Sequence, residues 1–192
     1  SNFFKCHQCG EIRHAGESCG NCGSWKLNML GYGIENIENK IKEIINPDNV
    51  FVLSKDVANT QKKATKVVTD FMDNPAGVLI GTEMALLYLQ ESVENVIVAS
   101  IDSMFSIPDF QIRERVLNIL LRSKARALSN FYIQTRNTEN KIFNDASKGN
   151  LADFYRQEFL SRKKLNYPPF KILIKISSEH TDKSKLEKDF EG

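Results

Sequence analysis

The chain has 192 residues, a length that permits one sizeable domain or one domain with a small module. Hydrophobic residues make up 41% and charged residues 26% of it, which excludes disordered, collagen-like and disulfide-rich classes. No apolar run approaches the ~20 residues that span a bilayer, and the first residues, Ser-Asn-Phe-Phe-Lys-Cys, lack the apolar h-region that is typical of a signal peptide. We therefore expect a soluble, cytoplasmic protein that does not contact membranes.

The net charge of +2 is unevenly distributed along the chain. Residues 1–108 carry 9 Lys/Arg against 13 Asp/Glu, whereas residues 109–176 carry 14 against 6. A surplus of +8 is a candidate footprint for nucleic-acid phosphate, because each neutralised phosphate releases counterions. A solvated helical surface has the same composition, so charge alone leaves both interpretations open.

The four cysteines form two Cys-x-x-Cys pairs near the N-terminus, separated by nine residues. Two such turns packed together typically close a tetrahedral four-thiolate zinc site, which leaves no position for water and is structural. A rubredoxin-like iron site and a redox dithiol are the alternatives. We expect an N-terminal zinc ribbon with one Zn²⁺ site, whose ligands are Cys6, Cys9, Cys19 and Cys22.

Apolar periodicity predicts alternating helices and strands from about residue 30 onward. The expected elements are helix 34–45, strand 50–53, helix 60–72, strand 78–80, helix 83–90, strand 96–101, helix 106–128, strand 131–134, helices 139–148 and 151–165, and strand 171–176. Ser106 and Pro108 are expected to begin the longest helix, as cap and first-turn residue. Repeated β-α units with apolar strands predict an α/β fold, in which helices flank both faces of a parallel sheet.

Three arginines share one side of that longest expected helix. At 100° per residue, Arg115, Arg122 and Arg126 fall within ~40° of one another. They would lie along the edge of the contact between the helix and the sheet, where they would face a polyanion. The alternative is that their stems cover apolar surface.

Several short motifs follow one another in a defined order. They are the two cysteine pairs, Gly-Tyr-Gly-Ile-Glu at 31–35, residues 56–60, Gly-Thr-Glu-Met at 81–84, Asp102, Pro-Asp-Phe at 108–110, Glu114-Arg115, and Leu-Asn-Tyr-Pro-Pro-Phe at 165–170. This ordered set resembles the primosomal replication-restart helicases, the family of primosomal protein N′. The resemblance covers about residues 4–176.

The resemblance implies three segments. They are a zinc ribbon at 1–30, the second RecA-like lobe of a superfamily 2, 3′-to-5′ DNA helicase at 31–166, and a junction with the start of a truncated C-terminal domain at 167–192. It also implies fork recognition and replisome reloading in DNA replication restart. The implied partners are forked or single-stranded DNA, primosome proteins and single-strand-binding proteins.

The chain departs from the family pattern at its nucleotide motifs. It contains no Gly-x-x-x-x-Gly-Lys-Ser/Thr loop, so ATP and Mg²⁺ would bind only if a complete helicase core is present. The family's Gln-x-x-Gly-Arg-x-x-Arg aligns with residues 122–129, which keep the first arginine as Arg126 but place Ser129 where the arginine finger would stand. The family's Lys-Gly aligns with Leu87-Tyr88. We therefore expect a divergent fragment whose lobe hydrolyses ATP poorly or not at all.

The family also carries eight cysteines that bind two zinc ions, whereas this chain has four. The two pairs present here belong to different metals in the family. We expect them to be re-paired into one site.

The candidate site residues each have a structural alternative. Thr82 would contact a DNA phosphate or cap a helix, and Asp102 would mark a vestigial nucleotide site, together with Arg126, or cap a turn. Trp25 would stack on a base or pack the ribbon. The expected nucleic-acid-binding residues are Thr82, Arg115, Arg122, Arg126, Lys163 and Lys164.

A second interpretation makes the chain a non-catalytic interaction module. In this case the zinc ribbon and the apolar stretch at residues 86–89 would dock a replication protein. Loss of the nucleotide motifs favours this interpretation, whereas retention of Arg115, Arg122 and Arg126 on one side of a helix favours DNA binding.

Overall fold

The structure is a computed structural model that describes residues 3–5, 12–14, 18, 20, 23, 33–99 and 101–174. Residues 1–150 form one compact unit and residues 151–192 a second, and each is described by itself. Two short antiparallel strands, β1 (Phe3–Lys5) and β2 (Ile12–His14), lie in the expected zinc-ribbon segment. The four cysteines and Trp25 lie outside the described residues.

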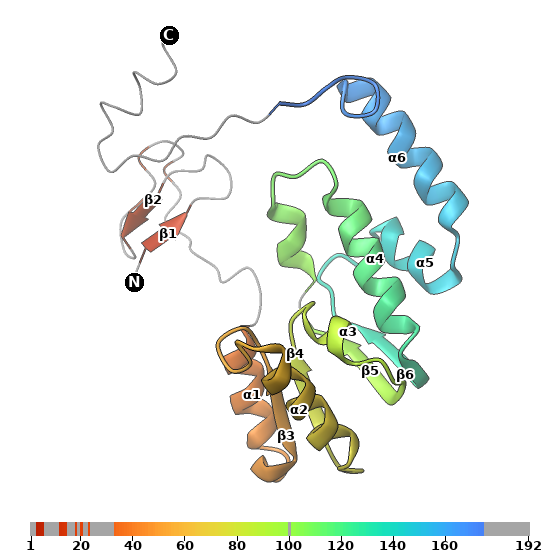
Figure 1. Ribbon diagram of the computed structural model, residues 1–192. Coiled ribbons are helices and arrows are strands. Elements are labelled where there is room, and N and C mark those ends of the chain that lie inside the picture. Colours follow the sequence, from red (N-terminus) through yellow and green to blue (C-terminus); the bar gives the residue numbers. More distant parts are fainter. Residues whose placement is uncertain are drawn as a thin grey trace. The chain divides into compact units, whose positions relative to one another are not determined.

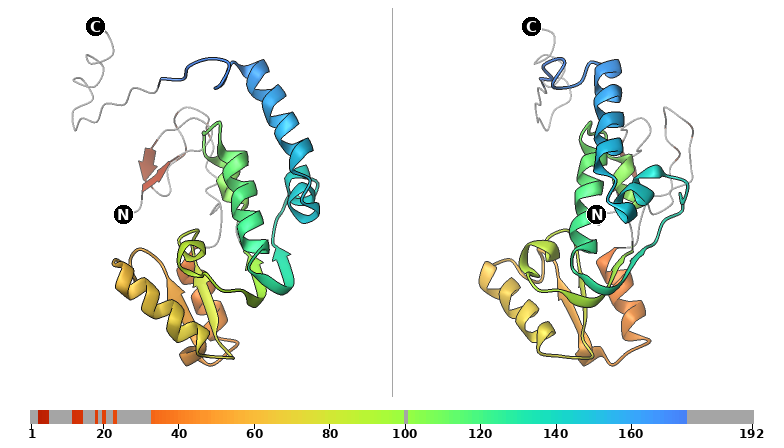
Figure 2. Two further views of the ribbon diagram at one scale, coloured as in Figure 1. Left: turned by 45° about the vertical axis from the view of Figure 1, so that its right-hand side comes forward. Right: turned by 90° about the vertical axis from the view of Figure 1, so that its right-hand side faces the viewer.

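The first α/β part of unit 1 is built on a parallel pair of strands, β3 (Val50–Leu53) and β4 (Val78–Gly81). The helices α1 (Ile34–Lys42) and α2 (Gln61–Met72) lie on opposite faces of this pair, as Figures 1 and 2 show. A 3-10 turn, η1 (Pro47–Asn49), precedes β3. The core of this first α/β part contains the buried side chains of Leu53, Ala58 and Ala64.

Local chemistry explains where α2 begins. Thr60 has extended backbone angles, and its Oγ1 accepts a hydrogen bond from the Lys63 N–H at 3.3 Å. A threonine in this position satisfies one of the unpaired N–H groups of a first helical turn. The predicted helix 60–72 is therefore confirmed, with Thr60 as its cap.

The second α/β part of unit 1 contains another parallel pair, β5 (Val93–Val98) and β6 (Ala127–Ile133). The helix α4 (Ile112–Lys124) contacts both strands and also α5 (Lys141–Lys148). Its buried side chains include Val116, Leu117, Ile119 and Leu120. The segment from β4 to β5 carries a short helix, α3 (Ala85–Tyr88), and the segment from β5 to α4 carries a 3-10 helix, η2 (Asp102–Ser106).

The predicted α/β class is confirmed, but the predicted single sheet is not what the described strands form. They pair as three separate two-stranded sheets. On β5 and β6 the side chains of Ile97, Tyr132 and Leu128 are 66%, 53% and 68% exposed. Helices on both faces are therefore found for β3 and β4, whereas one face of β5 and β6 is open among the described residues.

The expected helix 106–128 was wrong at both ends. Residues 102–106 form the turn η2, and the Asp109 carboxylate accepts from the Gln111 N–H at 2.9 Å, so the chain turns again before α4 begins at Ile112. Ser106 and Pro108 therefore do not begin the helix. At the other end Ala125 is the cap and β6 begins at Ala127, which places Arg126 beyond the helix.

Other boundaries also differ from the predicted ones. The expected helix 83–90 is reduced to the single turn of α3, because Leu89 has extended backbone angles. The strand expected at 96–101 begins and ends three residues earlier, as β5. No strand is found in residues 171–174, the described part of the expected strand 171–176.

Unit 2 contains the predicted helix 151–165, which is confirmed as α6 (Leu151–Leu165). Asn166 ends it in the left-handed conformation (φ 57°), and the Tyr167 N–H donates to the Arg162 carbonyl at 2.9 Å. Residues 167–170, the start of the expected junction, form a turn in which the Phe170 N–H donates to the Tyr167 carbonyl at 3.0 Å. None of the helices in the described ranges is long and apolar enough to cross a membrane.

Candidate nucleic-acid interface

The three arginines singled out from the sequence converge on one short segment of unit 1. Arg115 and Arg122 project from α4, and Arg126 follows the end of this helix. All three side chains donate hydrogen bonds to residues 83–90, the segment that carries α3 and leads from β4 to β5. We call this segment the α3 loop.

Arg115 binds the start of the α3 loop through an ion pair. Its Nη2 lies 2.7 Å and its Nε 3.2 Å from the same carboxylate oxygen, Oε2 of Glu83. The hydrogen bond to Glu83, followed by the charge of this carboxylate, raises the pKa of Arg115 above its usual value. The two side chains are 53% and 39% exposed, so the pair is accessible to solvent.

Arg122 and Arg126 bind neutral acceptors instead. The Nη2 of Arg122 donates to the Leu86 carbonyl at 2.8 Å, and the Nη1 of Arg126 donates to the Gln90 carbonyl at 2.5 Å. Both arginines are half-buried. Carbonyls in and after the last turn of a helix lack helical partners, so these two cations satisfy groups that the short α3 leaves unpaired.

Thr82 lies at the junction between β4 and the α3 loop. Its Oγ1 accepts from the Met84 N–H at 3.4 Å, and its carbonyl accepts from the Ala85 N–H at 2.8 Å. The side chain is exposed. Because the N-cap of α3 is Met84 and this helix has no side-chain cap hydrogen bond, Thr82 is not the helix cap weighed from the sequence, and solvent can still reach it.

Asp102 has two partners in the segment that follows β6. Its Oδ1 accepts from the Thr135 hydroxyl at 2.6 Å, and its Oδ2 accepts from the Arg136 N–H at 2.7 Å. Both carboxylate oxygens are thus used to hold the start of this segment. A nucleotide or metal at Asp102 would have to compete with these two hydrogen bonds.

Lys163 and Lys164 lie exposed in the last turn of α6. Positive charge at this end of a helix is favourable because the helix dipole is negative there. The two lysines belong to unit 2, whereas the three arginines belong to unit 1.

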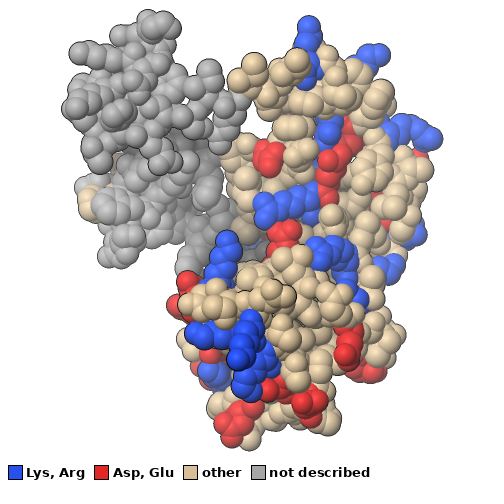
Figure 3. Space-filling view, in the orientation of Figure 1, with Lys and Arg blue, Asp and Glu red and all other residues tan. Residues whose placement is uncertain are grey.

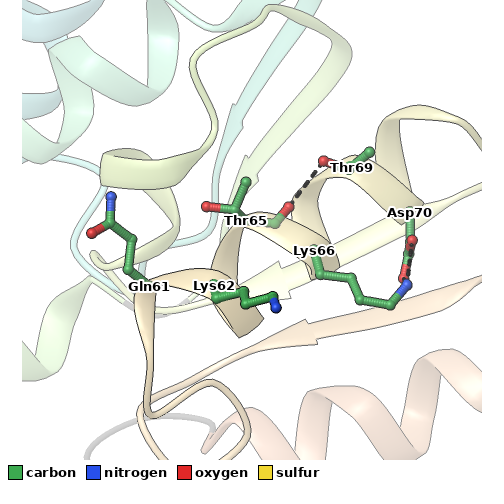
Figure 4. A pocket seen from close by; sticks show the side chains of 6 residues that line it. All are labelled: Gln61, Lys62, Thr65, Lys66, Thr69 and Asp70. Atoms are coloured by element: carbon green, nitrogen blue, oxygen red, sulfur yellow. Dashed lines mark hydrogen bonds and ion pairs between the residues drawn. The ribbon is translucent and has the colours of Figure 1, made fainter.

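Basic side chains also gather elsewhere in unit 1. Figure 3 shows Lys and Arg interspersed with Asp and Glu on the visible face, with a group of basic side chains over the part that holds α1, β3 and α2. A depression along α2 is lined by Gln61, Lys62, Thr65, Lys66, Thr69 and Asp70 (Figure 4). All six come from the exposed side of one helix, and Lys66 is paired with Asp70 at 2.7 Å, so this surface does not enclose a ligand.

Glu83 is the residue of this interface that the sequence did not single out. It lies 32 positions before Arg115, and residues so far apart have no common periodicity to reveal a contact. Its only signal is a carboxylate in the third position of the Gly-Thr-x-Met motif. The carbonyl partners of Arg122 and Arg126 leave no signal in the sequence at all.

Comparisons with known proteins give one consistent family. The chain is 28% identical over 200 residues to the replication restart protein PriA of Borreliella burgdorferi, an alignment that covers 99% of this chain and 30% of the relative. It is 25% identical to the protein of the same name from Bacillus subtilis, covering 95% of this chain and 23% of the relative. For the Chlamydia trachomatis protein of that name the identity is 30%, with 88% and 24% covered.

The chain thus spans about a quarter to a third of the length of these curated relatives. No family model matches it.

Proposed function

This chain is homologous to a segment of the replication restart proteins, and on that premise we propose that it is a DNA-binding lobe that acts in replication restart. The observation that carries the proposal is the extent of the alignment, which reaches 99% of the chain for a relative of that name. The proposed ligand is forked or single-stranded DNA. The proposed protein partners are primosome components and single-strand-binding proteins.

The fold of the described residues supports a helicase-like lobe. The order β3, α2, β4, then β5, α4, β6 repeats a strand, a helix and a parallel strand, which is the connection found in α/β nucleotide-binding lobes. We propose that residues 31–166 are a RecA-like lobe on this basis. The lobe as proposed has no ATPase of its own, because it lacks a phosphate-binding loop and carries Ser129 in place of an arginine finger.

The DNA-binding residues we propose are Thr82, Arg115, Arg122 and Arg126 in unit 1, with Lys163 and Lys164 in unit 2. Arg115 is the arginine best suited to reach a phosphate, because more than half of its side chain is exposed. A guanidinium carries five donors in a planar fork, and Glu83 occupies two of them, so a phosphate binds Arg115 either through the other three donors or by replacing Glu83.

We also propose that the chain binds one structural Zn²⁺ through Cys6, Cys9, Cys19 and Cys22. These residues lie outside the described part of the chain, so the proposal depends on the chemistry of the donor set. Four thiolates in two Cys-x-x-Cys pairs match the number and type of ligands that structural zinc prefers. Bound metal would supply folding energy to a segment with few apolar residues.

The second candidate function, a docking module for a replication protein, has less support from the α3 loop. Of the apolar residues at 86–89, Leu89 is buried, Leu86 and Tyr88 are half-buried, and only Leu87 is largely exposed, at 57%. Tyr88 packs against the core cluster of Leu53, Ala58 and Ala64. The stretch therefore mainly faces inward and offers one apolar side chain to a partner.

Fluorescence anisotropy with labelled forked, single-stranded and duplex DNA at several salt concentrations tests the proposal. We expect binding that prefers the fork and weakens steeply with salt, because lysine and arginine contacts with phosphate release counterions. Arg115→Gln should weaken binding, whereas Arg136→Gln, which removes an exposed arginine from the segment after β6, should change it little. Absence of binding at low salt would overturn the proposed function.

A further inference from the structure

The contact between Arg115 and Glu83 has the chemistry of an arginine bound to a phosphate. Two N–H groups of one guanidinium, Nε and Nη2, point at one anionic oxygen at 3.2 and 2.7 Å. Carboxylate and phosphate oxygens are the two anions that the arginine fork binds best, and they use the same donors. A phosphate that approached Arg115 in this geometry would therefore meet donors that Glu83 already occupies.

This contact is the weak one of the three that hold the α3 loop. Both partners of the ion pair are more than a third exposed, and exposed ion pairs contribute ~0 to 1 kcal/mol in general. Arg122 and Arg126 are half-buried and donate to main-chain carbonyls, so the loop stays anchored at Leu86 and Gln90 when the ion pair opens. Glu83 can thus move away from Arg115 without the rest of the loop leaving α4.

We propose that Glu83 acts as an intramolecular mimic of phosphate, which competes with nucleic acid for Arg115. Binding of a phosphate at Arg115 and release of Glu83 are then one coupled step. The inference rests on the proposed DNA-binding function and adds a residue that limits its affinity. Competition from Glu83 makes the protein bind DNA more weakly than Arg115, Arg122 and Arg126 would without this carboxylate.

The competition has a signature in the salt dependence of binding. A phosphate that displaces Glu83 leaves this carboxylate beside the DNA, which partly cancels the gain from Arg115. Removing the charge of Glu83 frees the guanidinium from its ion-pair partner, so the slope of log K against log salt should become steeper by up to ~0.9 for duplex DNA. The affinity should rise by ~1.4 to 5-fold, the factor that an exposed ion pair of this strength represents.

The test compares Glu83→Gln with three other variants of the whole chain by anisotropy over a range of salt. Glu91→Gln is the matched control, since it removes one exposed carboxylate just after the α3 loop. Arg115→Gln and the double variant complete a cycle that isolates the coupling between the two side chains. Circular dichroism verifies folding, and Glu83→Ala serves as a second variant of the same position.

We expect Glu83→Gln to bind more tightly and with a steeper salt slope than both the wild type and Glu91→Gln, and we expect no such gain when Arg115 is already Gln. The inference is overturned if Glu83→Gln matches Glu91→Gln, or if the gain persists without Arg115. In both of these cases the wild type still binds DNA, and the proposed function stands. If no variant binds at low salt, both proposals fall together.

Discussion

At the scale of single residues, four of the charged side chains singled out from the sequence are held by polar groups of the chain itself. Arg115, Arg122 and Arg126 each have an acceptor on the α3 loop, and Asp102 has two donors after β6. Such contacts orient the side chains, because a long arginine otherwise samples many rotamers. Any ligand of these residues must therefore fit an arrangement that already exists, or replace one of its contacts.

Asp102 gives a residue-scale prediction for stability. Asp102→Asn should lower the free energy of unfolding by ~1 to 3 kcal/mol. The carboxylate accepts from the Thr135 hydroxyl and the Arg136 N–H through two charged oxygens, whereas an amide has one accepting oxygen, which is neutral. Urea denaturation followed by circular dichroism measures the change. Asp56→Asn, at an exposed position in the loop after β3, is the control and should leave the midpoint unchanged. Equal midpoints for the two variants would contradict the structural role of Asp102.

At the scale of elements, the α3 loop is positioned by a close approach at the end of β4. A Cβ on Gly81 would lie 2.6 Å from the Cβ of Ala85 and 3.2 Å from the carbonyl oxygen of Leu53. Only glycine fits there without movement of β3 or α3. The position of Thr82 and Glu83, and hence of the ion pair with Arg115, depends on this contact.

Gly81→Ala is accordingly expected to destabilise unit 1 by ~1 to 3 kcal/mol, the usual cost of an overpacked position. Thermal unfolding should show a lower midpoint. Gly33→Ala is the matched control, because nothing lies within 4 Å of its added Cβ and its φ of −64° suits alanine. If both variants unfold at the same temperature, the close approach at Gly81 does not contribute to the stability of unit 1.

The boundaries of α4 show how far local patterns can determine an element. The turn η2 and the side chain of Asp109 redirect the chain before Ile112, although Ser106 and Pro108 form a plausible helix start in the sequence. Within the helix the apolar pattern was sufficient, and Val116, Ile119 and Leu120 are buried as their spacing predicts. The residue at which a helix begins depends on which of several nearby groups caps it. The side of the helix that is buried follows from the spacing of its apolar residues.

At the scale of the whole molecule, the zinc proposal gives a prediction about metal content. The purified chain should contain one zinc ion, and Cys19→Ser should lose it, because three thiolates bind zinc more weakly than four. Mass spectrometry of the native chain and elemental analysis measure this. His14→Ala, which removes an exposed imidazole from β2, should keep the metal. Two zinc ions per chain, or bound iron, would contradict the proposed site.

The sequence alone determined the α/β class, the helices α2 and α6, the strand β3 and the resemblance to the replication-restart family. These features depend on local periodicity, on caps such as Thr60, and on motifs that can be recognised one after another. The partners of the arginines, those of Asp102 and the division of the strands into separate pairs were decided by the tertiary structure. The physical reason is that these contacts join residues 32 to 36 positions apart, where neither propensity nor periodicity relates one side chain to the other.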